Sequence, residues 1–149
     1  MSVVAASGTV LGFDFGEKRI GVAVGETETG IAHPLMAIDA EATDRRFAQI
    51  EKVVLDWKPA AFIVGRPRHA DGAEHPIAKL AEKFGRRLAA RFGVPVTFVD
   101  ETLSSSEAQA QLREQHARIR AKQDVDALAA AVILQSYLDD PAVHERLAT

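Results

Sequence analysis

Short apolar runs separated by polar turns occupy the first third of the chain, which is a pattern typical of β-strands. Apolar residues dominate residues 10–15 and 20–24, and the polar turn at residues 16–19 between them favours a hairpin. A second turn at residues 25–30 leads to a third apolar stretch around residues 34–38. We therefore predict an antiparallel meander of three strands.

In the middle of the chain, apolar residues recur at steps of three and four, as they do on one face of a helix. This spacing predicts a helix over residues 43–57, which ends at Lys58-Pro59 because the residue before a proline disfavours helical geometry. The fully apolar stretch 61–64 is typical of a strand buried on both faces. A second amphipathic helix is expected from residue 77 to about 93, and residues 94–99 form the fifth predicted strand.

The last third of the chain is predicted to be helical. A capping box of the form Ser-x-x-Glu at residues 104–107 indicates a helix that runs to about residue 115. A polar, basic segment at residues 116–123 separates it from a last helix at 125–138. Residues 127–134 of that helix are apolar all round, so we expect this helix to be buried.

Together these elements predict an α/β fold with a mixed five-stranded sheet: a three-stranded antiparallel meander, then two parallel strands, with helices on both faces. The length of 149 residues fits one domain, residues 1–149, with flexible tails expected at 1–8 and 140–149. In sheets of this kind, ligands bind at the carboxyl ends of the parallel strands.

Three acids occupy unusual positions in this pattern. Asp14 lies inside an apolar strand, Glu101 just beyond the fifth strand, and Asp126 at the head of the apolar last helix. A desolvated carboxylate is costly unless a cation or hydrogen-bond donors compensate it, so these acids suggest a shared metal site at one end of the sheet.

Each acid also has a simpler interpretation. Asp14 could form the hairpin turn, and either Glu101 or its neighbour Asp100 could cap the helix that starts near Ser104. Acids near a helix N-terminus such as Asp126 are common because they complement the helix dipole. The metal interpretation therefore depends on the three acids acting together.

Composition narrows the chemistry of that site. The chain has no cysteine, which excludes disulfides and thiolate ligands and leaves oxygen or imidazole donors, as preferred by Mg²⁺ or Mn²⁺. We see no secretory signal, and the longest apolar run, residues 127–134, is far too short to span a bilayer. We therefore expect a cytoplasmic protein with no membrane partner.

Positive charge is concentrated in two stretches of a chain whose net charge is -3. By direct count, residues 77–93 carry a net charge of +4 and residues 113–122 a net charge of +3. Each cation taken alone is best explained as part of a solvated helix face, but their segregation suits a phosphate backbone. The loop at residues 65–72 would add cations at the same end of the sheet as Glu101, although a surface histidine is an equally good explanation of His69. The candidate nucleic-acid contacts are Lys18, Arg19, Arg66, Arg68, His69, Arg113, Arg118, Arg120 and Lys122.

Four motifs, in order, resemble those of the YqgF (RuvX) family of RNase H-like proteins. They are Gly-Phe-Asp-Phe-Gly-Glu-Lys-Arg-Ile-Gly-Val-Ala-Val at 12–24, the loop at 64–72, Asp-Glu-Thr-Leu-Ser-Ser at 100–105, and the segment at 122–135. The resemblance extends over about residues 10–138. This chain departs from the family pattern in having Arg66 in place of a leucine, His69 in place of an Asn-like residue and Thr102 in place of an arginine, so Arg66 or Arg68 is the candidate replacement for the missing arginine.

The resemblance implies an RNase H-like nuclease fold, with Asp14, Glu101 and Asp126 as catalytic and metal-binding residues. It also implies kinship to Holliday junction resolvases. Our leading hypothesis is a divalent-metal-dependent nuclease with two Mg²⁺ or Mn²⁺ ions, which hydrolyses phosphodiesters during maturation of the 5′ end of pre-16S rRNA in ribosome biogenesis. The substrate would be structured or single-stranded RNA, and the protein a monomer or weak homodimer.

Two other functions remain open on the same scaffold. Resolution of four-way DNA junctions would use the same acids, and a non-catalytic RNA-binding module would need none of them. A phosphotransferase resembling sugar kinases and actin-like ATPases also places Asp-x-Gly before a basic turn, but those proteins close two domains around ATP, and this chain has room for one.

Overall fold

The computed structural model describes residues 8–67, 76–101, 122–140 and 145–146, without the side chains of residues 67, 101, 122–124, 145 and 146. The expected helix at 104–115 lies outside these residues. In chain order the elements are β1 (Thr9–Asp14), β2 (Arg19–Glu26), β3 (Ile31–Asp39), α1 (Thr43–Trp57), β4 (Ala61–Pro67), α2 (Pro76–Phe92), β5 (Val96–Glu101), α4 (Lys122–Asp139) and β6 (Glu145–Arg146).

The strands form one mixed sheet in the order β3-β2-β1-β4-β5-β6. Strands β1, β2 and β3 are antiparallel neighbours, whereas β4 pairs in parallel with both β1 and β5. The predicted meander followed by two parallel strands is therefore confirmed. The sheet also has a sixth strand, since the two-residue β6 pairs antiparallel with β5 inside the stretch expected to be a tail, 140–149.

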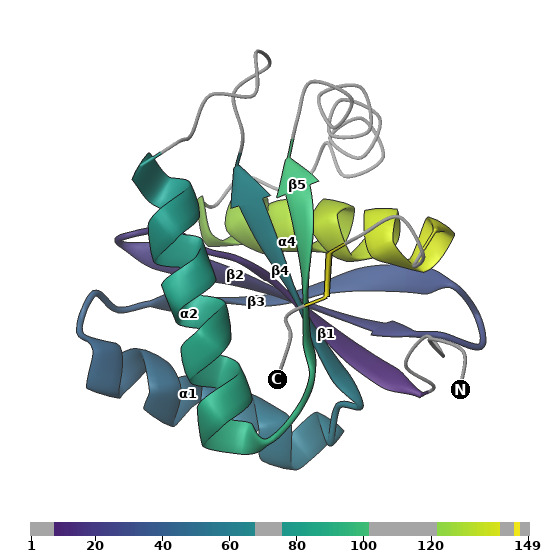
Figure 1. The fold of residues 1–149 in the computed structure, drawn as a ribbon, viewed down its shortest axis with the longest axis horizontal. Coiled ribbons are helices and arrows are strands. Elements are labelled where there is room, and N and C mark those ends of the chain that lie inside the picture. The colour runs from purple at the N-terminus through teal and green to yellow at the C-terminus, as the bar shows by residue number, and fades with distance from the viewer. Residues whose placement is uncertain (1–7, 68–75, 102–121, 141–144, 147–149) are drawn as a thin grey trace.

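One face of the sheet is covered by α1 and α2 (Figure 1) and holds an aromatic core. Phe84 of α2 lies at its centre, with ring centroids 5.6 Å from Phe13, 5.3 Å from Phe15 and 5.8 Å from Phe47. Strand positions 11 and 13 point to this face, as the alternation of a β-strand requires. Large side chains therefore separate α1 and α2 from the strands.

The other face is covered by α4, which packs against β1, β2 and β3 with small residues. A Cβ added to Gly12 would lie 2.7 Å from Cβ of Leu134, and one added to Gly25 would lie 2.9 Å from Cδ1 of Leu138. Alanines 130 and 131 supply much of the helix surface in this contact. The helix therefore approaches the sheet far more closely than α1 and α2 do.

The predicted bounds of α1 are those observed, whereas β5 ends two residues later than predicted and α4, at Lys122–Asp139, extends beyond the predicted 125–138 at both ends. Helix α1 spans Thr43–Trp57 as predicted, and Lys58 ends it in the left-handed conformation with φ of 48°. Strand β5 continues to Glu101 because its parallel pairing with β4 extends to the pair Pro67–Glu101. Glu101 is thus the last residue of the strand rather than the residue after it.

Within the described residues, no helix is long and apolar enough to cross a membrane. The apolar stretch of α4 is instead buried against the sheet, with Ala130 and Leu134 fully inaccessible to solvent.

Candidate active site

The carboxyl ends of the parallel strands β1, β4 and β5 lie at the same end of the sheet, which we call the carboxyl end. Asp14 is the last residue of β1 and Glu101 the last residue of β5. Phe13, Val64 and Phe98 lie side by side at one level across the three strands. Asp14 follows this level by one residue and Glu101 follows it by three residues. The sheet alone therefore brings two of the predicted acids to one end.

Asp126 reaches the same place because α4 begins against a glycine. Gly21 is the antiparallel partner of Asp14, which places the two Cα atoms about 4.5–5.5 Å apart. A Cβ at Gly21 would overlap the backbone oxygen of Asp126. The start of α4 thus lies directly on the strand next to Asp14, and the alternation of β1 points the Asp14 side chain toward that helix.

The donor chemistry of this end fits a hard divalent cation. Asp14 and Asp126 offer carboxylate oxygens, and Glu101 ends the neighbouring strand. The Glu101 side chain lies outside the described part, and the described side chains alone form no group of three acids or histidines that could hold a metal. A complete site therefore requires a ligand beyond those two aspartates, and Glu101 is the predicted one.

Arg19 pairs with one of the two aspartates. Its Nε donates a hydrogen bond to Oδ2 of Asp126 at 2.6 Å, and the two side chains are 30% and 26% exposed. The hydrogen bond and charge of Asp126 raise the pKa of Arg19, and the charge of Asp39, its partner across β2 and β3, acts in the same direction. A permanent positive charge consequently lies beside the carboxylate that we predict to bind metal.

The turn that carries Lys18 and Arg19 is held by a residue that the sequence prediction missed. Arg46 of α1 is buried and donates from Nη2 to the carbonyl oxygens of Gly16 at 2.7 Å and Glu17 at 2.5 Å. Its Nε donates to the carbonyl oxygen of Ala40, and burial lowers the pKa of its guanidinium. The available signal was its position four residues before Ile50, on the apolar stripe of α1.

Arg66, a predicted nucleic-acid contact, is buried on the other face of the sheet. Its Nε donates to Oδ1 of Asp100 at 2.8 Å, its Nη1 donates to Oε2 of Glu82 at 3.1 Å, and its side chain is 5% exposed. The guanidinium also lies over the Phe98 ring, 5.2 Å from the centroid. In this structure, Arg66 therefore links β4, β5 and α2 just below the carboxyl end.

The structure describes only some of the other predicted cations. Lys18 is exposed in the turn next to Arg19, and Lys122 begins α4, four residues before Asp126, although its side chain is not described. Five more of the predicted contacts lie outside the described residues: Arg68, His69, Arg113, Arg118 and Arg120.

The sequence matches the family described as "RuvX: Holliday junction resolvase" over residues 8–140. A relative from Dechloromonas aromatica (strain RCB), named "Putative pre-16S rRNA nuclease", is 54% identical over 135 residues, which is 90% of this chain and 92% of the relative. A protein of the same name from Burkholderia ambifaria (strain MC40-6) is 48% identical over 142 residues, covering 95% of each chain.

Solved structures share the fold at low sequence identity. The structure titled "T. thermophilus RuvC in complex with Holliday junction substrate" matches with a TM-score of 0.62 at 19% identity, over 94% of this chain and 99% of that one. The yeast mitochondrial Holliday junction resolvase Ydc2 matches with a TM-score of 0.56 at 13% identity, over 92% and 80% of the two chains. The family match over residues 8–140, together with relatives about 50% identical along nearly the whole chain, shows that this chain belongs to the RuvX (YqgF) family.

Proposed function

We propose that this protein is a divalent-metal-dependent nuclease that hydrolyses phosphodiester bonds in the maturation of the 5′ end of pre-16S rRNA. The observation that carries the proposal is the approach of Asp126 to Asp14 through the side-chain-free surface of Gly21, at the end of the sheet where β5 ends in Glu101. The names of relatives at about 50% identity supply the substrate.

Phosphodiester hydrolysis needs an activated water and compensation of the negative charge that grows on the phosphate. In a carboxylate site, one or two Mg²⁺ or Mn²⁺ ions supply both requirements when bound. The Asp14, Glu101 and Asp126 side chains would hold these ions. The protein itself then needs no covalent nucleophile.

The chain's own cations would position the substrate. Arg19 is hydrogen-bonded to Asp126 and Lys18 precedes it in the chain, and we propose that both cations bind the phosphate that flanks the scissile bond. Two backbone hydrogen bonds from Arg46, to Gly16 and Glu17, hold the turn that carries both cations against α1. Arg46 would therefore preserve the position of both cations without touching the substrate.

Cleavage of branched DNA is a second candidate function. It is favoured by the RuvC-like fold and by the family description. Symmetrical cutting of a four-way junction requires two active sites related by a twofold axis, whereas trimming of an RNA end requires one. Size measurement in solution, with and without a junction, would therefore help to separate the two. We propose RNA as the natural substrate and the cytoplasm, where ribosomal precursors are matured, as the location.

The decisive experiment compares Asp14→Asn with the wild-type protein on precursor 16S rRNA and on a four-way DNA junction in the presence of Mg²⁺ or Mn²⁺. We expect the wild-type protein to cut the rRNA precursor and the variant to lose at least a hundredfold in rate, because the amide replaces an anionic metal ligand. Asp56→Asn, the same change at an exposed position of α1, is the matched control and should cut normally. Equal cutting by Asp14→Asn would contradict the proposal, and cutting of the junction alone would assign the second function.

A further inference from the structure

Helix α2 carries a row of cations on its outer surface. Lys79, Lys83, Arg87 and Arg91 follow one another at intervals of four residues, and all four are exposed. We call these four residues the α2 cation ridge. Successive members are about 6 Å apart along the helix axis, so the ridge is about 18 Å long. A duplex strand carries one phosphate per ~3.4 Å of axis, so a ridge of this length faces on the order of five phosphates.

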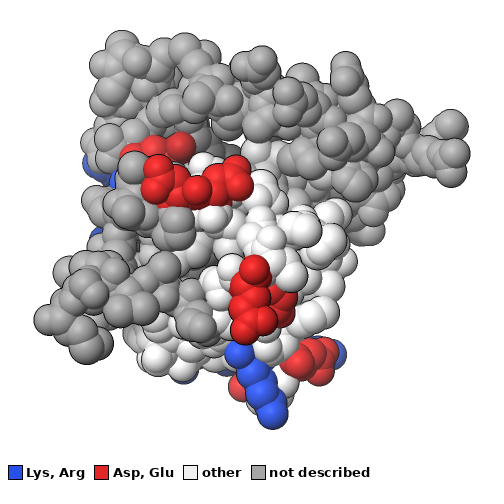
Figure 2. Space-filling model, turned by 90° about the vertical axis from the view of Figure 1, so that its right-hand side faces the viewer, with Lys and Arg blue, Asp and Glu red and all other residues white. Residues whose placement is uncertain are grey.

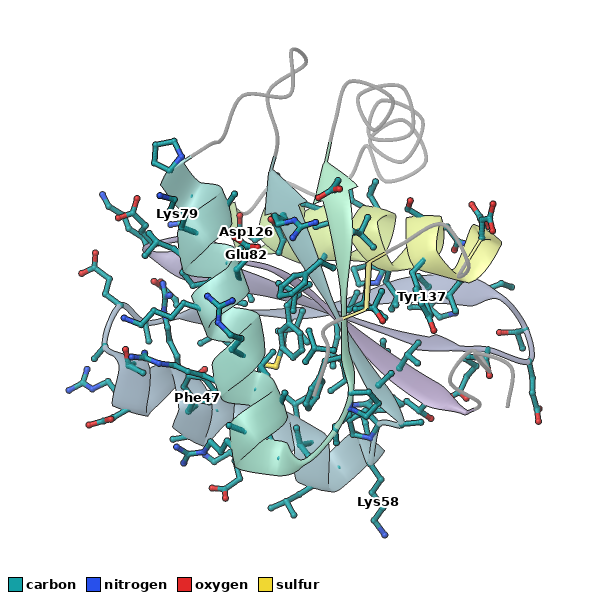
Figure 3. The ribbon with its side chains drawn as sticks, viewed as in Figure 1. Phe47, Lys58, Lys79, Glu82, Asp126 and Tyr137 are labelled. Carbon is teal, nitrogen blue, oxygen red and sulfur yellow. The ribbon has the colours of Figure 1, made fainter. Side chains whose placement is uncertain are left out.

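The ridge begins at the carboxyl end and leads away from it. Helix α2 starts at Pro76, shortly after β4 ends at Pro67, and runs back along the sheet. Figure 3 shows Lys79 on the half of α2 nearest the arrowheads of β4 and β5, and Phe47 beside the other half. The ridge therefore begins at the end of the sheet where the predicted acids lie.

The acid of α2 is paired with a buried arginine. Glu82 is turned toward the sheet, where its Oε2 accepts a hydrogen bond from the buried Arg66 at 3.1 Å. In the part of the chain that the structure describes, Lys83, Arg86 and Arg87 form no ion pair with a carboxylate.

At its far end the ridge borders a groove between α1 and α2. The groove has a volume of about 370 Å³ and is lined by Thr43, Phe47, Arg87, Ala90 and Arg91. The Phe47 ring supports the guanidinium of Arg91, which lies over it at 5.4 Å from the ring centroid. The ridge therefore ends in a guanidinium that is held over an aromatic ring.

Another part of the described surface is mainly acidic. Figure 2 views the molecule from the right-hand side of Figure 1, away from α2, and there acidic side chains form several groups on the described surface while basic ones are few. The whole chain has a net charge of -3, so the positive charge of α2 is a local feature and not a general excess.

We propose that the α2 cation ridge is a second RNA-binding surface, which holds the phosphate backbone of a duplex segment flanking the cleavage site. This inference rests on the proposed function, because it assumes that RNA lies at the carboxyl end. The substrate would then be base-paired beside the scissile bond. The ridge on α2 would select this substrate, and the three acids would catalyse its hydrolysis.

The test measures binding of two RNAs to the full-length protein in EDTA, so that cleavage does not compete with binding. One RNA is a short single strand that reaches only the carboxyl end, and the other is the same strand extended by a hairpin. The variant is Lys83→Gln/Arg87→Gln. The matched control is Arg45→Gln/Lys52→Gln, which removes two exposed cations from α1, neither of which lines the groove. All four positions are exposed, so the melting temperatures should stay close to that of the wild type.

We expect Lys83→Gln/Arg87→Gln to weaken binding of the hairpin RNA about tenfold and to lower the slope of log affinity against log salt by about 1.5, with binding of the short RNA unchanged. Unchanged binding of the hairpin RNA would overturn the proposal, as would equal losses for both RNAs or an equal loss in the α1 control. Cleavage of either RNA in EDTA would contradict the metal dependence of the proposed function and leave this binding result intact.

Discussion

The two faces of the sheet are built in opposite ways. On the face covered by α1 and α2, phenylalanine rings from strands and helices fill the space between the layers. On the face covered by α4, glycines of β1 and β2 meet a helix rich in alanine, and the backbone of Asp126 lies against Gly21. One face gains stability from the bulk of its side chains and the other from the closeness of its backbones.

This difference explains which face can host the candidate site. Carboxylates on separate elements share a cation only when their backbones approach to within the reach of short side chains. Asp14 and Asp126 meet this condition because no Cβ separates β2 from the start of α4. A helix held off by phenylalanine rings, as α2 is, could not bring an aspartate as near. We call the face covered by α4 the close face and the face covered by α1 and α2 the aromatic face. The close face should therefore control activity, and the aromatic face should control stability.

The largest effect on stability should come from the aromatic face. Phe84→Ala removes the ring that contacts Phe13, Phe15 and Phe47 and leaves a cavity, so we expect a loss of about 3–5 kcal/mol in the free energy of unfolding. Urea denaturation would measure this loss. Metal affinity and cleavage by the folded fraction should stay at wild-type levels, and a matching loss of metal affinity would mean that the two faces are not independent.

The next effect should come from the close face and act on function. Gly21→Ala places a methyl group on the backbone oxygen of Asp126 and pushes α4 away from Asp14, so we expect about a hundredfold loss in cleavage rate and roughly 1–3 kcal/mol in stability. Single-turnover cleavage and urea denaturation would measure the two quantities.

Gly12→Ala is the graded control for this prediction. Its methyl group would meet the side chain of Leu134 at 2.7 Å, and the oxygen of Ala130 only at 3.2 Å, farther along the helix from Asp126. It should lower stability with a much smaller loss of rate. Equal rate losses in the two variants would show that general packing of α4, and not the contact at Gly21, controls activity.

A smaller effect should appear where the close face meets solvent. Arg19→Gln removes the cation that is hydrogen-bonded to Asp126, so we expect the affinity for Mn²⁺, measured by calorimetry without substrate, to rise several-fold. Lys18→Gln, which removes the neighbouring exposed charge but leaves this pair intact, should change the Mn²⁺ affinity much less. Weaker Mn²⁺ binding by Arg19→Gln would show that the pair aligns Asp126 for the metal instead of competing with it.

Most of the architecture could be predicted from local patterns. The alternation and turns of the first third predict β1 to β3, and the spacing of Phe47, Ile50 and Val53 predicts α1 at its observed bounds. The pattern misplaced the end of β5 and missed β6 because strand ends depend on pairing with a neighbour, here on the pairs Pro67–Glu101 and Phe98–Glu145. A two-residue strand has no periodicity that a sequence could reveal.

The sequence by itself determined which residues are candidates for the chemistry: acids at positions that an apolar strand or buried helix does not normally accept, and cations concentrated in two stretches. The acids can be recognised in the sequence because a charged residue at an apolar position breaks the hydrophobic pattern. Only the tertiary structure decided how these residues combine. It turns Arg66 and Glu82 toward each other, commits Arg46 to the turn of Lys18 and Arg19, and lays Asp126 on Gly21 beside Asp14. Contacts between residues about a hundred positions apart arise from the packing of one helix on one sheet. The local spacing of residues along the chain does not predict such contacts.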